Sequence, residues 1–102
     1  STHLLQCLVL SENGLKMIWR GEFQINLLHN VKVLILCFHT EADEFPYEIL
    51  QQVPNIEKLV VYDASFKDIL CCQSPSVDYT GLLLQLKVLH LDSLEELVSI
   101  GL

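Results

Sequence analysis

The sequence predicts an α/β repeat solenoid with a parallel β-sheet on its concave face and loops and short helices on its convex face. Two observations support this. An aliphatic motif occurs four times along the 102 residues, and its successive copies lie 26, 25 and 30 residues apart. A repeat of this length cannot bury its apolar residues alone, so repeats stack on their neighbours. We therefore expect one domain of about four repeats over residues 1–102.

The motif has aliphatic residues at its first, fourth, seventh and ninth positions, which is the pattern of a leucine-rich-repeat solenoid. Fifteen of the sixteen positions are aliphatic, and Thr2 is the exception. Because side chains alternate between the two faces of a strand, the last two positions of each copy should point into the core. The expected inward pairs are Leu8/Leu10, Leu34/Leu36, Leu59/Val61 and Leu89/Leu91, in repeat cores near residues 5–12, 31–38, 56–63 and 86–93.

The segments between the repeat cores should form the convex side. A helix is expected over residues 46–52, which begin with a proline suited to a first helical turn and end before Pro54. The first repeat should return through residues 15–19. Residues 94–100 have an apolar residue at every third position, which predicts a packed turn. The last interval is the longest, and the Ser-Pro-Ser stretch and aspartate of residues 74–78 predict an extra loop there.

Composition and charge exclude several classes of function. The net charge is −7 with six lysines and arginines, so nucleic-acid phosphates and anionic lipids would repel the chain. The longest uncharged apolar run, Val33–Phe38, is far shorter than the ~18 residues that predict a membrane span. Four cysteines without a regular spacing, and no Asn-x-Ser/Thr site, favour a reducing, cytoplasmic location.

No pattern predicts an enzyme, a cofactor site or a metal site. Cys37-x-His39 and the adjacent Cys71 and Cys72 are the only hints of thiol or metal chemistry. A zinc site needs about four ligands in paired spacing, and a catalytic cysteine needs a base and an orienting group in contact. We interpret these residues as small buried or loop residues. The acidic residues within 41–44 are interpreted as a solvated loop before a helix, with a cation site or a partner contact as the alternatives.

Residues 53–61, Val-Pro-Asn-Ile-Glu-Lys-Leu-Val-Val, with Ser-Phe-Lys-Asp-Ile at 65–69, carry a more specific signal. Together with residues 21–50 and 86–97, they resemble the C-terminal leucine-rich repeats of plant coiled-coil NB-ARC-LRR disease-resistance proteins. The resemblance covers nearly the whole chain. Such repeats often carry asparagine or cysteine three residues after the last strand leucine. Asn13 fills that position in the first copy, but the others depart from the pattern with His39, Ala64 and Leu94.

The resemblance implies the sensing region of an intracellular plant immune receptor, which recognises pathogen effectors or holds the receptor autoinhibited. The implied partners are an effector, a guarded host protein or the receptor's own NB-ARC domain. ADP and ATP would bind only in that separate domain, since this chain has no Gly-x-x-x-x-Gly-Lys-Ser/Thr motif. The alternative is a leucine-rich-repeat adaptor, such as the substrate-recognition arm of an F-box ubiquitin ligase.

Outward strand positions on the concave face are the candidate protein-contact site. Their valines and isoleucines also suit strand propensity alone. Several apolar side chains exposed together, however, would make a patch of the kind that marks contact sites. The predicted contact residues are Val9, Ser11, Glu12, Ile35, Cys37, Phe38, Val60, Tyr62, Asp63, His90 and Asp92.

Overall fold

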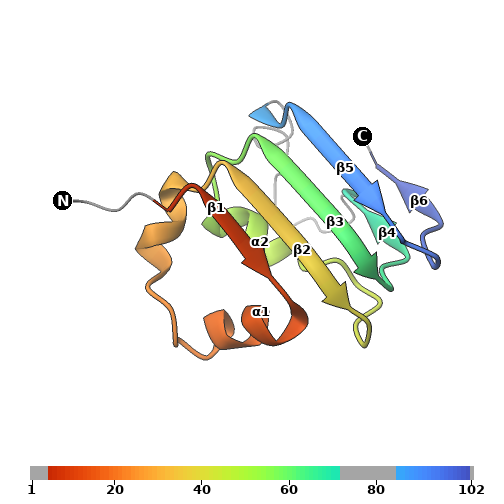
Figure 1. Ribbon diagram of the computed structural model, residues 1–102, viewed down its shortest axis with the longest axis horizontal. Coiled ribbons are helices and arrows are strands. Elements are labelled where there is room, and N and C mark those ends of the chain that lie inside the picture. Colours follow the sequence, from red (N-terminus) through yellow and green to blue (C-terminus); the bar gives the residue numbers. More distant parts are fainter. Residues whose placement is uncertain (1–4, 72–84, 102) are drawn as a thin grey trace.

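The computed structural model describes residues 5–71 and 85–101, and its main feature is a four-stranded parallel sheet (Figure 1). Each strand lies in one of the four predicted repeat cores and is rich in β-branched and aliphatic residues. The strand order in the sheet is β1-β2-β3-β5, which follows the chain. The strands are β1 (Cys7–Leu10), β2 (Val33–His39), β3 (Lys58–Ala64) and β5 (Val88–Asp92).

The strands pair in the register that the repeated motif predicts. Leu8 is paired with Leu34, Leu34 with Leu59, and Leu59 with Leu89. The second inward position forms a parallel row of Leu10, Leu36, Val61 and Leu91. In the two central strands these side chains are at most 1 % exposed. Leu89 and Leu91 on the edge strand β5 are only partly buried, whereas Leu8 and Leu10 on the other edge strand, β1, are buried.

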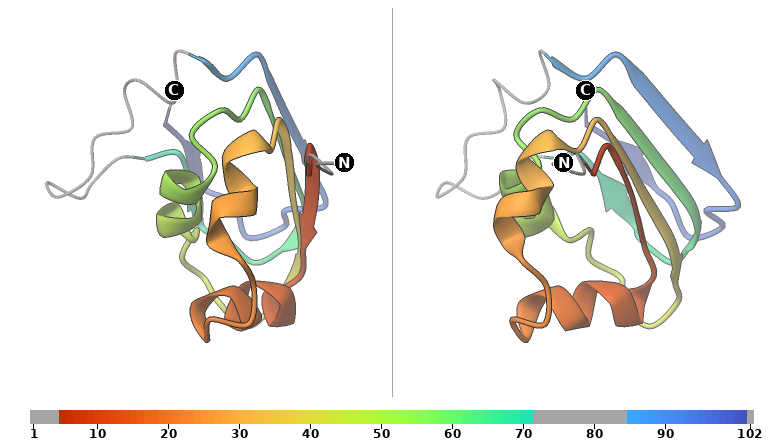
Figure 2. Two further views of the ribbon diagram at one scale, coloured as in Figure 1. Left: turned by 90° about the vertical axis from the view of Figure 1, so that its left-hand side faces the viewer. Right: turned by 60° about the vertical axis from the view of Figure 1, so that its left-hand side comes forward.

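Within the described residues, helical segments cover one face of this sheet and leave the opposite face open (Figure 2). The covering segments are the 3₁₀ helix η1 (Ile25–Asn30) and the helix α2 (Tyr47–Gln52). The latter matches the predicted helix except that Pro46 takes the N-cap position. Its Ile49 and Leu50 are buried against the sheet. The expected loop at residues 74–78 lies outside the described residues.

Helix α1 (Glu12–Trp19) follows β1 directly and forms the first return segment. Its N-terminus is capped by Ser11, whose Oγ accepts a hydrogen bond of 3.2 Å from the Gly14 backbone N–H. Leu15 and Ile18 lie four and seven residues after Ser11 and are buried, whereas Trp19 remains 46 % exposed. Helical periodicity thus turns two of the four apolar residues of this helix into the core, and Met17 and Trp19 stay exposed.

A second, two-stranded parallel sheet joins β4 (Asp68–Ile69) to β6 (Ser99–Ile100). The predicted packed turn is present at its start, where the Leu97 N–H donates to the Leu94 carbonyl at 3.2 Å. It does not reach Ile100, which is 44 % exposed in β6. The prediction is wrong there because backbone pairing extends the chain. The Gly101 N–H also donates to Ile69, and a Cβ at residue 101 would lie 2.5 Å from a backbone oxygen.

The Tyr47 hydroxyl joins α2 to the segment that follows β4. It accepts a hydrogen bond from the Cys71 backbone N–H at 3.0 Å and contacts a carboxylate oxygen of Asp68 at 3.3 Å. Burial is the main reason why the pKa of Tyr47 is raised from 10.0 to about 12. The neighbouring Asp68 carboxylate also disfavours the phenolate.

This pKa shift predicts a loss of stability at alkaline pH. Between pH 10 and about 12, Tyr47 loses its proton in the unfolded chain but keeps it in the folded protein, so the unfolding free energy falls as pH rises. Below pH 10 the contribution is fully present. Urea unfolding across this range should show the fall in the wild type and a smaller fall in Tyr47→Phe. If the unfolding free energies of the two proteins had the same pH dependence, the raised pKa assigned to Tyr47 would be wrong.

Candidate functional site

The open face of the sheet carries most of the predicted contact residues. Val9 and Phe38 are 56 % and 54 % exposed. Ile35 and Val60 are half-buried between them, and register places Val9, Ile35 and Val60 side by side on β1, β2 and β3. Apolar side chains therefore form a continuous surface over three strands. Tyr62 is half-buried on this face, and Asp63, His90 and Asp92 are exposed.

A left-handed residue stands at the same position near the end of three strands. Phe38, Asp63 and Ser93 have φ values of 59°, 50° and 53°. This conformation breaks the regular alternation of side chains. As a result, the residue after each of the first two, His39 and Ala64, returns to the core. This row of left-handed residues explains how two successive residues of a strand, such as Tyr62 and Asp63, can both lie on the open face.

Phe38 is the unusual member of this row. Aspartate and serine tolerate left-handed backbone better than a large aromatic residue does, so the conformation is strained at Phe38. Its ring packs edge-to-face on Tyr62, with centroids 5.5 Å apart and planes at 80°. Strained residues held in place by their surroundings gather at binding and catalytic sites. Phe38 and Tyr62 are therefore the strongest candidates on the open face.

Three predicted contact residues do not offer side chains to a partner as expected. Cys37 is 3 % exposed, and a hydrogen bond with its thiol is the main cause of the raised pKa of Tyr62. Ser11 and Glu12 lie at the start of α1 because the strand ends at Leu10. The Glu12 carboxylate accepts backbone hydrogen bonds from Glu41 at 3.3 Å and Ala42 at 3.0 Å. Glu12 and Cys37 thus contact neighbouring repeats, and Ser11 caps its own helix.

His39 has a structural role that the sequence pattern put in doubt. Its side chain is 1 % exposed, and its Nε2 lies 3.0 Å from the Leu10 carbonyl oxygen of the preceding strand. An imidazole N–H thus satisfies a backbone acceptor on the adjacent strand, the role expected of an asparagine at this position of a leucine-rich repeat. Asn13, which has the expected residue type, instead lies exposed on α1. The helix start moves it away from the core.

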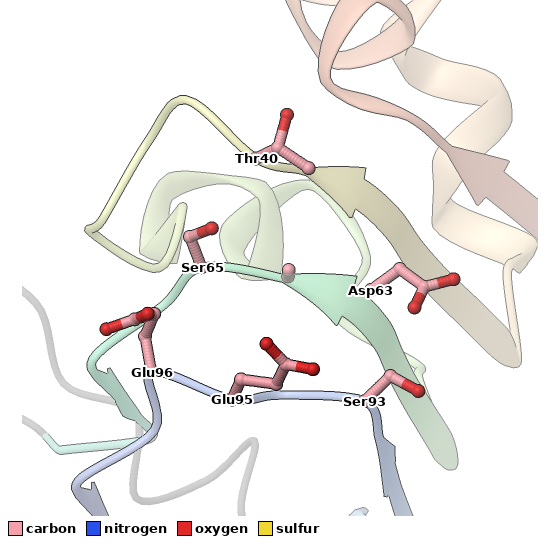
Figure 3. Close-up of a pocket in the computed structure, with 7 residues that line it drawn as sticks. Thr40, Asp63, Ser65, Ser93, Glu95 and Glu96 are labelled. Atoms are coloured by element: carbon pink, nitrogen blue, oxygen red, sulfur yellow. The ribbon is translucent and has the colours of Figure 1, made fainter.

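A hollow of about 300 Å³ opens at the carboxyl ends of β2, β3 and β5 (Figure 3). Its acidic side chains come from two segments: Asp63 from the end of β3, and Glu95 and Glu96 from the turn after β5. In Figure 3 the Glu95 carboxylate points toward the end of β3. Thr40, Ala64, Ser65 and Ser93 complete the lining. Asp63 was among the contact residues predicted from the sequence, but the two glutamates, which lie three and four residues after the end of β5, were not.

The rest of the described chain supplies no second kind of site. Among residues 5–71 and 85–101, no group of three histidine, cysteine, aspartate or glutamate side chains is arranged to hold a metal ion. No helix within these ranges is long and apolar enough to cross a membrane. Cys71 is half-buried, and its thiol lies 3.5 Å from the Ser99 hydroxyl. Cys72 lies outside the described residues.

Comparison with known proteins adds no relative. No protein-family model, curated protein or solved structure matches this chain. The geometry of the open face and the resemblance of residues 53–61 and 65–69 are therefore the observations that bear on function.

Proposed function

We propose that this chain is a protein-contact region in the leucine-rich-repeat solenoid of an intracellular plant immune receptor. The supporting observation is the open sheet face, where Val9, Phe38 and their half-buried neighbours form one apolar surface. Monomeric proteins seldom leave such contiguous surfaces uncovered unless they bind a partner. Equivalent positions of the four motif copies pair with one another across the sheet, which supports stacked repeats. The resemblance to plant resistance proteins supports the immune role.

The proposed role is to recognise a pathogen effector or a guarded host protein, or to hold the receptor autoinhibited through its own NB-ARC domain. Each of these needs a rigid surface and no chemistry from this chain. Four strands about 4.8 Å apart span only ~15 Å, which is narrow for an interface of about 800 Å² per partner. Contacts at the strand ends would therefore contribute to recognition. The proposed location is the cytoplasm, and ADP or ATP would act in the separate NB-ARC domain.

The test replaces Phe38 and Tyr62 with alanine together in the intact receptor and measures pathogen-triggered cell death in leaf tissue. Buried aromatic anchors contribute about 2 kcal/mol or more each to an interface, which corresponds to roughly 30-fold in affinity. We expect the response to be lost if the face recognises an effector. We expect the variant to cause cell death without a pathogen if the face keeps the receptor autoinhibited.

The matched control replaces Met17 and Trp19 with alanine. These residues are 47 % and 46 % exposed on α1, so the substitution removes comparable apolar surface elsewhere. It should leave the response unchanged. A Phe38/Tyr62 variant that accumulates normally and responds like the wild type, with and without the pathogen, would show that the proposed role is wrong.

A further inference from the structure

The open face has an apolar part and an acidic part. The apolar part lies on β1, β2 and β3, and Val9 and Phe38 are its most exposed side chains. The acidic part lies at the carboxyl ends of β3 and β5, where three carboxylates line the hollow shown in Figure 3 and a fourth belongs to the residue just before Ser93 of its lining. These carboxylates belong to Asp63, Asp92, Glu95 and Glu96, and all four residues are exposed.

These four carboxylates have no cation beside them among the described residues. The ion pairs of the described chain lie elsewhere: Lys16–Glu41, Arg20–Glu22, Lys67–Asp43 and Lys87–Glu57. Within the part of the chain that the structure describes, Asp92 accepts a side-chain hydrogen bond of 3.2 Å only from the neutral Ser93 hydroxyl. The acidic part therefore keeps its negative potential, which would steer and orient a cationic partner.

We propose that the open face binds a basic protein segment, with an arginine or lysine side chain in the acidic hollow and apolar side chains over Phe38 and Tyr62. This inference rests on the proposed protein-contact role of the face and specifies the chemistry of the partner. The hollow of about 300 Å³ lies directly beyond Asp63, which follows Tyr62 in the chain. One short segment can therefore reach the aromatic pair and the carboxylates together.

Charge also decides against other occupants of the face. A second copy of the chain carries the same net charge of −7, so it would bring more negative charge to an acidic surface. Nucleic acid would place phosphates against the same carboxylates. An arginine side chain suits this site best, because its planar guanidinium can bind two carboxylates or a carboxylate and a hydroxyl at once. Ser65 and Ser93 supply such hydroxyls in the hollow.

The test measures binding of two short peptide probes to the full chain by calorimetry and by backbone-amide NMR. In one probe tryptophan alternates with arginine, and in the other tryptophan alternates with glutamate. The arginine probe should bind, should shift the amide signals of Asp63, Ser93 and Glu95, and should bind more weakly as salt is raised. The double substitution Glu95→Gln and Glu96→Gln should weaken its binding by about tenfold, as loss of a charge pair predicts.

The control substitution Glu44→Gln with Glu48→Gln removes the same charge from exposed residues of the loop and helix α2. It should change affinity by less than about twofold, since neither residue lines the hollow and exposed charges are screened by salt. Equal binding of both probes, no binding of the arginine probe, or unchanged affinity in the Glu95/Glu96 variant would overturn the inference. Self-association through this face in the absence of a probe would also overturn it.

The peptide result and the immune-response result can fail separately. If the Phe38/Tyr62 variant loses the response but the Glu95/Glu96 variant binds the arginine probe normally, the basic-partner inference is wrong and the proposed function stands. If the Glu95/Glu96 variant loses probe binding while the Phe38/Tyr62 variant responds normally, the proposed immune role is wrong.

Discussion

Replacement of Phe66 with alanine is expected to lower the free energy of unfolding by about 3–5 kcal/mol, the usual cost of deleting a fully buried phenylalanine. Phe66 is 0 % exposed. Its ring lies 5.4 Å from the ring of Phe45 and 5.4 Å from that of His39, measured between centroids. It therefore joins the loop before α2 to the end of β2. Removing it leaves a cavity that these rings can fill only in part.

Urea denaturation followed by circular dichroism would measure this loss. Phe38→Ala is the matched control, because Phe38 is 54 % exposed and sits in strained left-handed backbone. Its replacement should cost less than about 1 kcal/mol, since little buried area is lost. If the Phe66 and Phe38 variants were equally stable, the core assigned around Phe66 would be wrong.

Replacement of His39 with alanine should lower the free energy of unfolding by about 2–4 kcal/mol. Part of the loss comes from the cavity beside Phe66, and part from the Leu10 carbonyl, which loses the N–H donor at 3.0 Å. An unsatisfied buried acceptor costs about 1–3 kcal/mol. The effect should therefore exceed that of removing a similar side chain from the surface.

A second substitution separates packing from hydrogen bonding at this position. His39→Leu fills most of the imidazole volume but donates no hydrogen bond, so it should remain about 1–3 kcal/mol less stable than the wild type. His39→Asn restores a donor and should recover part of that loss. Denaturation midpoints of the three variants would measure the difference. Wild-type stability in His39→Leu would show that the contact with Leu10 contributes nothing.

The positions of the strands and their register could be predicted from the sequence. Leu8, Leu34, Leu59 and Leu89 recur at intervals that match one repeat, and burying that apolar row is possible in only one pairing. Helix α2 was predictable for a similar reason, since Pro46 and Pro54 limit it at both ends. In these cases the free energy of folding depends on a local sequence pattern, and any neighbouring repeat with the same pattern can bury the apolar residues.

The details of the candidate site could not be predicted in this way. Whether Cys37 is buried depends on Tyr62 beside it, and the role of Glu12 depends on a backbone loop 29 residues further along the chain. Nothing in the sequence near Phe38 indicates a left-handed conformation, because the residue types that usually mark one are glycine, asparagine and aspartate.

The sequence alone thus determined where the apolar rows lie and how the strands pair, because a repeated hydrophobic period fixes which side chains can be buried together. Only the tertiary structure decided which residues form the open face and the acidic hollow. Asp63 and Glu95 are separated by a whole repeat, and they come together because β3 and β5 pair. Contacts between repeats depend on side-chain geometry at strand ends, which no periodicity in the sequence specifies.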